Sequence, residues 1–140
     1  MDDGRAHRDT PGDLLPAVSR RLRREVRGAL EPLGMTPHHA RALSVIERDG
    51  PMRLRDLAGT LRIAPRSVTD VVDHLQDASL LTRSPDPGDR RATVITVTAE
   101  GRSMSRRLER ARRAAADAVF ADLSDSDRAE LTRILHLLLD

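Results

Sequence analysis

The sequence contains no cysteine and no lysine, so all 24 of its basic residues are arginines. Without these two residue types the chain cannot form disulfides, thiolate or lysine nucleophiles, or a Walker-type phosphate loop, which requires a lysine. Tryptophan and tyrosine are also absent, which leaves Phe120 as the only residue of the Phe, Trp and Tyr group. Aromatic platforms that stack on the bases of single strands or RNA loops are therefore excluded, whereas duplex DNA remains a candidate partner.

Long apolar runs are missing as well. The 140 residues are 39% hydrophobic and 33% charged, a balance typical of one soluble globular domain and unlike that of a membrane-spanning or disordered chain. The first seven residues are polar and lack the apolar segment of a secretory signal. We therefore expect a single-domain cytoplasmic protein.

Charge is unevenly distributed, although the net charge is only +2. Residues 1–52 carry nine arginines and eight acidic residues, residues 53–113 carry 13 and eight, and residues 114–140 carry two and six. The middle segment is therefore the basic one, with a net charge of +5. Two explanations are open: the arginine-rich codon usage of a GC-rich genome together with solvated helix faces, or the binding of a nucleic acid.

The N-terminal third predicts two helices. Residues 1–12 show no apolar periodicity and are expected to form a loose arm. From Leu14 onward, apolar residues recur at the spacing of three and four that is typical of an amphipathic helix. Thr36 and Pro37 are typical of a helix start, and the second helix is expected to run from Pro37 to about Arg48. Its expected buried residues are Ala40, Leu43, Val45 and Ile46.

The middle segment predicts two short helices joined by a tight turn, which is the outline of a helix-turn-helix motif. The first is expected over residues 54–61. The second begins at Pro65, places apolar residues at i, i+3, i+4 and i+7, and ends near Ser79. Two strands, at 80–83 and 93–98, follow with a long turn-rich loop between them and indicate a hairpin.

Two further helices complete the predicted architecture. Thr98 is expected to cap a long helix with near-heptad apolar spacing, and Ser124 begins a capping box for the last helix. The apolar stripes of the first helix and the last two helices are broader than a small core requires, which favours a second subunit as their partner. The alternative is that these helices pack only within one subunit.

Residues 52–104 resemble the winged helix-turn-helix of MarR-type bacterial regulators, and the likeness extends over residues 14–138. Four features in this order carry it: the Ser-Val-Thr of the second short helix, a following Leu-Leu, an Asp-Arg-Arg triplet in the hairpin, and Thr-x-x-Gly after it. These features are Ser67-Val68-Thr69, Leu80-Leu81, Asp89-Arg90-Arg91 and Thr98 with Gly101.

The resemblance implies a mainly α fold with a small β-hairpin wing, that is, a winged helix-turn-helix with N- and C-terminal dimerisation helices. It divides the chain into an N-terminal arm (1–12), dimerisation and support helices (13–50), a DNA-binding lobe (51–100) and C-terminal dimerisation helices (101–140). The implied function is that of a homodimeric, sequence-specific transcription regulator, a repressor that a ligand releases from a pseudo-palindromic operator. Two-fold symmetry predicts half-sites about 34 Å apart.

The resemblance also implies which residues contact DNA, through a recognition helix (65–79) and a wing (84–92). Arg66 is the candidate for base recognition because a guanidinium binds guanine O6 and N7 bidentately. The alternative for Arg66 is an i,i+4 ion pair with Asp70. The full set of candidate DNA-binding residues is Arg53, Arg55, Arg62, Pro65, Arg66, Ser67, Thr69, Asp70, His74, Arg83, Asp89, Arg90 and Arg91.

The wing arginines, Arg90 and Arg91, are expected to reach the minor groove or its flanking phosphates, where a narrow groove concentrates negative potential. Asp89 is expected to fix the loop and so orient them. The alternative for this triplet is an ordinary charged hairpin tip. Four further arginines are candidate phosphate contacts, with simple solvation as the alternative for each: Arg53, Arg55, Arg62 and Arg83.

The chain departs from the family pattern on its recognition helix. Asp70, Asp73 and Asp77 give the helix an acidic outer edge, which repels phosphates. Either the helix enters the groove by its N-terminal tip alone, or Asp70 accepts from a cytosine amino group. Ala64 replaces the usual capping serine, and Ser79 replaces the customary glycine. The acidic edge also motivates a second hypothesis, a winged-helix protein-interaction module that does not bind DNA.

Nothing in the sequence predicts catalysis, a metal or a cofactor. His38 and His39 are adjacent and so point about 100° apart on a helix, which is a poor geometry for one metal ion. They are expected to be partly exposed helix residues, with the lining of an effector cavity as the alternative for one of them. His74 and His136 have the pattern of ordinary helix residues. Without aromatic side chains, such a cavity between helices 1, 2 and 5 should favour a small apolar or anionic effector.

Overall fold

The computed structural model describes residues 9–139. Its elements, in chain order, are the helix α1 (Pro11–Leu30), a 3-10 turn η1 (Glu31–Leu33), α2 (Pro37–Asp49), β1 (Met52–Arg53), α3 (Leu54–Leu61), α4 (Pro65–Asp77), β2 (Leu81–Asp86), β3 (Asp89–Val97), α5 (Ala99–Val119) and α6 (Asp125–Leu139). The three strands form an antiparallel sheet in the order β1-β3-β2. The predicted fold class, mainly helical with a small β-hairpin wing, is confirmed.

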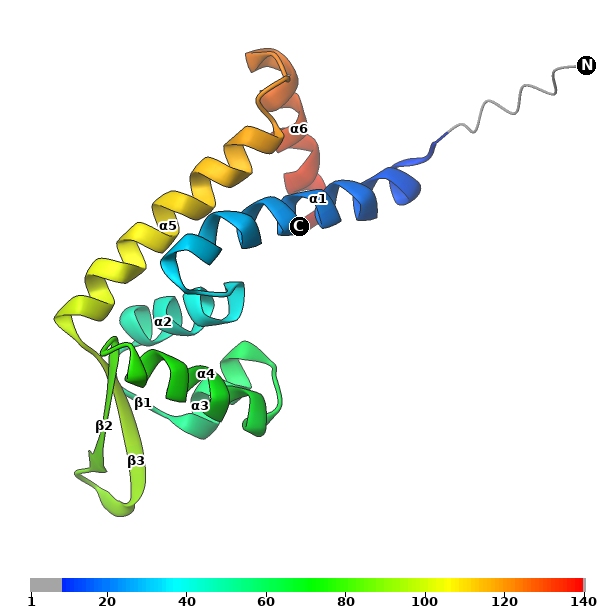
Figure 1. The fold of residues 1–140 in the computed structure, drawn as a ribbon. Coiled ribbons are helices and arrows are strands. Elements are labelled where there is room, and N and C mark those ends of the chain that lie inside the picture. Colours follow the sequence, from blue (N-terminus) through cyan, green and yellow to red (C-terminus); the bar gives the residue numbers. More distant parts are fainter. Residues whose placement is uncertain (1–8, 140) are drawn as a thin grey trace, which may run out of the picture.

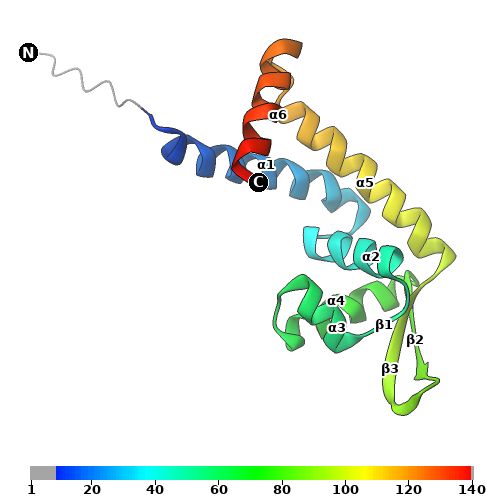
Figure 2. The same cartoon turned by 180° about the vertical axis from the view of Figure 1, so that it is seen from behind.

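The elements are arranged as a lobe with a long helical extension. Figure 1 shows α2, α3, α4 and the sheet gathered in the lobe, from which the β2–β3 hairpin projects on the side away from α6. Helix α5 runs from the lobe to α6, and α1 lies beside α5, as the view from behind also shows (Figure 2). The hairpin and the terminal helix therefore occupy opposite ends of the molecule.

The hydrophobic core lies in the lobe. Each short element contributes one apolar face to it, and the side chains that are almost inaccessible to solvent include Leu43 of α2, Leu57 of α3, Leu75 of α4 and Ile95 of β3. No buried side-chain nitrogen or oxygen atom of the described residues lacks a hydrogen-bond partner. Burial of the apolar face of α4 fixes the orientation of this helix within the lobe.

Helices α2 and α5 begin at the predicted capping residues, whereas α1 begins earlier than predicted. Thr36 caps α2 as predicted, and Thr98 accepts a hydrogen bond from the Gly101 N–H at 2.9 Å at the start of α5. The first helix, however, starts at Pro11 because Thr10 caps it through a reciprocal bond with Asp13. Residues 11 and 12, expected in the arm, therefore belong to α1, and residues 1–8 of that arm lie outside the described residues.

The expected long loop of the hairpin is wrong. Strands β2 and β3 continue to Asp86 and Asp89, which face each other, so only Pro87 and Gly88 form the turn. The Gly88 N–H donates to Asp86 Oδ1 at 2.9 Å. Because aspartate side chains bond the turn backbone in this way, the polar segment can still pair as strands. The wing is therefore a stiffer two-stranded ribbon than its composition predicts.

Backbone geometry restricts which residue types fit at Ser79, after the end of α4, and at Gly101, near the start of α5. Ser79 has a φ of 63°, in the left-handed region where glycine is favoured, and α4 ends at Asp77, two residues before the predicted end. Gly101 lies in the first turn of α5 against β2 and β3. A Cβ at Gly101 would lie 2.2 Å from the Leu80 carbonyl oxygen and 2.8 Å from Val97 Cγ1, so no larger residue fits without movement of the backbone.

The substitution Gly101→Ala is therefore expected to lower the free energy of unfolding by about 2–3 kcal/mol through overpacking. The matched control is Gly28→Ala, because a Cβ at Gly28 of α1 meets nothing within 4 Å. This control should raise stability by up to about 1 kcal/mol through helix propensity. Urea unfolding at fixed protein concentration measures both, and equal stabilities of the two variants would contradict the packing argument.

Candidate nucleic-acid interface

The recognition helix α4 presents a polar face to solvent. Val68, Val71, Val72 and Leu75 are buried, whereas the predicted contact residues Pro65, Arg66, Ser67, Thr69 and Asp70 are all exposed. The Thr69 hydroxyl donates to the Pro65 carbonyl oxygen at 3.1 Å. No ion pair joins Arg66 to Asp70 among the described residues, so the guanidinium of Arg66 is not held by the carboxylate one turn away.

The N-terminal tip of α4 carries uncapped backbone donors. Ala64 offers no side-chain cap, as the sequence predicts, and the first intrahelical bond is made by the Val68 N–H to the Ala64 carbonyl oxygen. The N–H groups of Arg66 and Ser67 therefore point out of the helix end without an intrahelical acceptor. Together with the Arg66 guanidinium and the positive end of the helix dipole, they make this tip attractive to an anion.

Arg83, expected to contact a phosphate, is instead bound to the recognition helix. Its Nη2 lies 2.5 Å from Asp73 Oδ1, and its Nη1 donates to the side-chain oxygen of Gln76. This pair ties β2 to α4. It also neutralises Asp73, the central member of the acidic edge. Spacing along the sequence does not predict this contact, because it joins residues of different elements.

Arg53 has a similar role at the wing. Its Nε and Nη2 donate to Asp86 Oδ2 at 2.9 and 2.6 Å, which ties β1 to the far end of β2. The hydrogen bond from the Gly88 N–H, followed by the bond from Arg53, lowers the pKa of Asp86 below its ordinary value. Arg53 therefore helps to hold the hairpin, and its contact with a phosphate stays a prediction.

The remaining arginines of the predicted set are on the surface. Arg90 and Arg91 are exposed on β3 at the wing, and the Arg91 N–H donates to Asp89 Oδ1 at 3.0 Å. Asp89 therefore does bond the wing backbone, as expected. Arg62 is exposed in the turn between α3 and α4, where it adopts a left-handed φ of 54°. Arg55 is exposed on α3, 3.9 Å from Asp56.

His74 is not brought together with these residues. Its ring stacks on His39 of α2, with ring centroids 4.1 Å apart, and its Nε2 lies 3.0 Å from the Gly34 carbonyl oxygen. Position 74 therefore lies on the flank of α4 next to the start of α2, away from the tip of α4, and a contact of His74 with DNA stays a prediction. His39 Nδ1 accepts the Thr36 N–H at 3.0 Å, and His38 is exposed.

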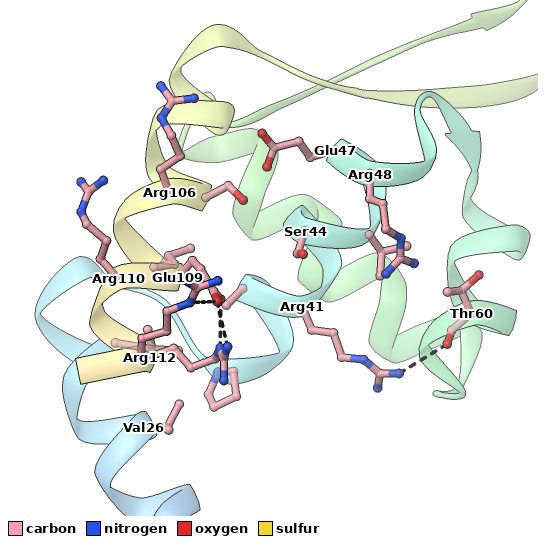
Figure 3. Close-up of a pocket in the computed structure, with 17 residues that line it drawn as sticks. Val26, Arg41, Ser44, Glu47, Arg48, Thr60, Arg106, Glu109, Arg110 and Arg112 are labelled. Carbon is pink, nitrogen blue, oxygen red and sulfur yellow. Dashed lines mark hydrogen bonds and ion pairs between the residues drawn. The ribbon is translucent and has the colours of Figure 1, made fainter. Parts of the chain in front are cut away.

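A cavity of about 910 Å³ lies between α1, α2 and α5 and reaches the end of α3 (Figure 3). Neither His38 nor His39 lines it, so that alternative is not supported. Its apolar lining includes Val26, Leu30 and Leu108. Its charged lining comprises Arg41, Glu47, Arg48, Arg106, Glu109, Arg110, Arg112 and Arg113. Hydrogen bonds from Arg112 and Arg113 lower the pKa of Glu109 to about 2. With six arginines and two acidic residues, the lining carries an excess of positive charge.

A second, apolar groove lies between the N-terminal half of α1 and the end of α5 with α6. None of the described residues of α6 is buried, although the helix is rich in leucine. The exposed large apolar residues of the described chain are all on α1 and α6: Leu14, Leu15, Val18, Ile134, Leu135, Leu137, Leu138 and Leu139. A cluster of this kind marks a surface that another chain covers.

These features together define a winged helix-turn-helix protein whose recognition helix and wing expose arginine side chains. The chain belongs to the MarR family: the family model described as "MarR family" matches residues 35–93. The HTH-type transcriptional repressor Rv2887 of Mycobacterium tuberculosis is 33% identical over 131 residues, which cover 93% of this chain and 94% of that protein. The transcriptional repressor MdtR of Bacillus subtilis is 26% identical and covers 62% of this chain and 56% of that protein.

Solved structures give the same result. The structure of Rv2887 in complex with DNA matches with a TM-score of 0.79 and 31% identity, covering 92% of this chain and 97% of that chain. The complex of Rv2887 with salicylic acid matches with a TM-score of 0.74 and 32% identity, covering 94% and 98%. Apo MarR from E. coli has the same fold, with a TM-score of 0.84 at 20% identity over 94% of this chain and 97% of that chain.

Residues 9–139 contain neither a candidate metal-binding cluster nor a candidate membrane-spanning helix. No cluster of three or more histidine or acidic side chains in this range has an arrangement that could hold a metal ion. No helix in the same range has the length and hydropathy needed to cross a membrane.

The stacked histidines generate a pH prediction. Burial, followed by the neighbouring His74 and His38, lowers the pKa of His39 from 6.5 to about 4. The folded state therefore prefers neutral His39, so its contribution to stability is present above pH 6.5 and is lost as the pH falls from 6.5 toward 4. Because water reaches part of the ring, we expect a loss of about 1 kcal/mol from this residue between pH 7 and pH 5.

The test is His39→Gln, which retains a side-chain oxygen that can accept the Thr36 N–H but does not titrate. Its free energy of unfolding should fall less between pH 7 and pH 5 than that of the parent chain. His38→Gln, one residue away and exposed, serves as the control and should keep the parental pH dependence. Parallel pH profiles of the parent and His39→Gln would contradict the assignment.

Proposed function

We propose that the chain is a homodimeric, sequence-specific DNA-binding transcriptional repressor that a small anionic effector releases from a pseudo-palindromic operator. The observation that carries the proposal is the exposed tip of α4, where Arg66, unpaired backbone donors and the helix dipole coincide, beside a wing that carries Arg90 and Arg91. The relative Rv2887, which matches over nearly the whole chain, was solved bound to DNA.

The geometry favours entry of α4 into the major groove by its N-terminal tip. Arg66 would bind base edges, Ser67 and Thr69 would contact bases or the adjoining phosphates, and Arg90 and Arg91 would contact the minor groove or its phosphates. The pair of Arg83 with Asp73 removes part of the acidic edge that would repel the DNA backbone. That edge was the motive for a protein-interaction module, so no specific observation now favours the second hypothesis.

Two-fold symmetry follows from the terminal helices. Helix α6 buries none of its described side chains within its own subunit, and α1 exposes leucines beside it. Covering these residues with the same helices of a second copy gives an isologous interface. The two recognition helices would then be carried on one side of the dimer, in register with half-sites about 34 Å apart.

The cavity between α1, α2 and α5 is the proposed effector site. Its lining combines aliphatic side chains with an excess of arginines, which favours a small molecule with an apolar body and an anionic group. Rv2887 was solved with salicylic acid and with p-aminosalicylic acid, which have this chemistry. The named relatives are transcriptional repressors. A repressor of this kind would act on DNA in the cytoplasm and would have no enzymatic role.

The operator test separates base recognition from phosphate contact. Fluorescence polarisation with the promoter DNA beside the protein's own gene should show tight, salt-sensitive binding. Arg90→Ala is expected to weaken binding to operator and unrelated DNA alike, by about 10-fold. Arg66→Ala should weaken operator binding by about 1–3 kcal/mol and relax the preference for the operator.

Arg107→Ala, on an exposed site of α5 outside the lobe, is the control and should bind as the parent does. Salt-insensitive or absent binding by the parent chain would contradict the proposed function. A loss of affinity that is uniform across sequences in Arg66→Ala would remove only the base-recognition role of that residue.

The dimer is tested at the apolar face of α6. Leu138→Asp places a charge on a residue that lines the apolar groove and is 71% exposed in the single subunit. It should shift the protein to monomers in sedimentation experiments and reduce operator affinity more than 10-fold, because two half-sites are no longer bound together. His136→Asp adds the same charge to α6 outside the groove lining and should remain dimeric; a dimeric Leu138→Asp variant would contradict the interface.

A further inference from the structure

We propose that Arg41 couples the effector cavity to the helix-turn-helix, and that a carboxylate ligand acts by drawing its guanidinium off the end of α3. The inference rests on the proposed function and adds to it the residue that transmits the ligand. Arg41 is the one described arginine that both lines the cavity and bonds to the helix-turn-helix.

The contacts of Arg41 span two elements. From α2, its Nη1 donates to the Leu61 carbonyl oxygen at 3.2 Å and its Nη2 to the Thr60 carbonyl oxygen at 3.5 Å. The second contact is the dashed line beside Thr60 in Figure 3. These carbonyls belong to the last two residues of α3, where a helix has no further N–H groups to bond them. A cation at this end also interacts favourably with the helix dipole.

The segment after these carbonyls leads directly to the recognition helix. Arg62 turns in the left-handed region, and α4 begins at Pro65, only three residues further on. The position of the end of α3 therefore determines where the tip of α4 starts. Because Arg41 is an exposed residue outside the hydrophobic core, its bonds can be broken without opening that core.

Three of the other five arginines that line the cavity are paired with acidic side chains. Arg112 and Arg113 both bond Glu109, and Arg48 bonds Asp49 with two hydrogen bonds. Arg41, in contrast, bonds only neutral carbonyl oxygens among the described residues. A carboxylate that enters the cavity can offer Arg41 a bidentate pair between opposite charges, which adds an electrostatic attraction that the neutral carbonyl oxygens do not supply. Figure 3 shows Glu47 pointing away from Arg41, at the other end of the cavity.

The ligand class follows from the lining. A carboxylate at Arg41 would leave the rest of the molecule against Val26, Leu30, Val45 and Leu108, which are aliphatic. A small carboxylic acid with an apolar body fits both requirements. Its binding would release the carbonyls of Thr60 and Leu61 and loosen the start of α4, so the ligand and the operator would favour different states of the same turn.

The experiment uses salicylate as the probe and measures operator affinity with and without saturating salicylate. For the parent chain we expect salicylate to weaken operator binding at least 10-fold, within the usual range of coupling between sites. In Arg41→Gln, operator affinity without ligand should fall about 3- to 10-fold, and the effect of salicylate should shrink to less than 2-fold. Arg41→Lys keeps the charge and should recover part of the salicylate effect.

The matched control is Arg128→Gln. Arg128 also donates from its guanidinium to a carbonyl at a helix end, that of Phe120 at 3.1 Å, but lies outside the cavity and the helix-turn-helix. This variant should bind operator and respond to salicylate as the parent does. A second measurement uses the parent chain and so does not require any variant to fold. Hydrogen exchange of the backbone N–H groups of residues 62–64 should be faster with salicylate than without it.

The outcomes are distinct. A purely structural role for Arg41 would lower operator affinity in Arg41→Gln but leave the salicylate effect at saturation unchanged, and this would overturn the inference. Operator binding by the parent chain that saturating salicylate does not alter, or exchange at residues 62–64 that it does not accelerate, would also overturn it while leaving the DNA-binding function intact. Absence of operator binding by the parent chain would overturn the proposed function, and the inference with it.

Discussion

The structure depends on burial of the apolar face of α4 in the core of the lobe. Val68, Val72 and Leu75 are almost inaccessible to solvent, and removing one such side chain would cost several kcal/mol. A helix held this firmly by one face has no freedom to rotate, so its opposite face, with Arg66 and Asp70, points outward. The polar residues of α4 make few bonds within the subunit, and the core sets their direction.

Ion pairs between elements then orient what the core leaves at the surface. Arg83 joins β2 to α4 through Asp73, and Arg53 joins β1 to β2 through Asp86. Surface pairs of this kind contribute little to stability individually. Their effect here is geometric, because the first pair connects the wing to the recognition helix and the second connects the far end of β2 to β1. Arginines and aspartates that composition alone presents as a loose charged surface thus hold the wing and α4 in one arrangement.

Two further surfaces lie outside the recognition helix and the wing. Helix α6 carries leucines that its own subunit leaves uncovered, which is what a symmetric partner would bury. Six arginines line the cavity between α1, α2 and α5; three of them pair with acidic side chains, whereas Arg41 is bonded to the end of α3. A protein that must respond to a ligand needs such a contact, strong enough to favour one state and weak enough to be exchanged.

The amino-acid sequence is enough to predict the order of the helices, their caps at Thr36 and Thr98, the outward face of α4 and the family resemblance, because these depend on local spacing and on residue types that act within one element. It does not predict that His74 stacks on His39, that Arg53 and Arg83 are bound within the subunit, or that Arg41 reaches α3, which the packed fold shows. Each of these contacts joins residues of different elements, up to 35 positions apart for the two histidines. Periodicity carries no information about such distances, since they follow from how the buried faces pack.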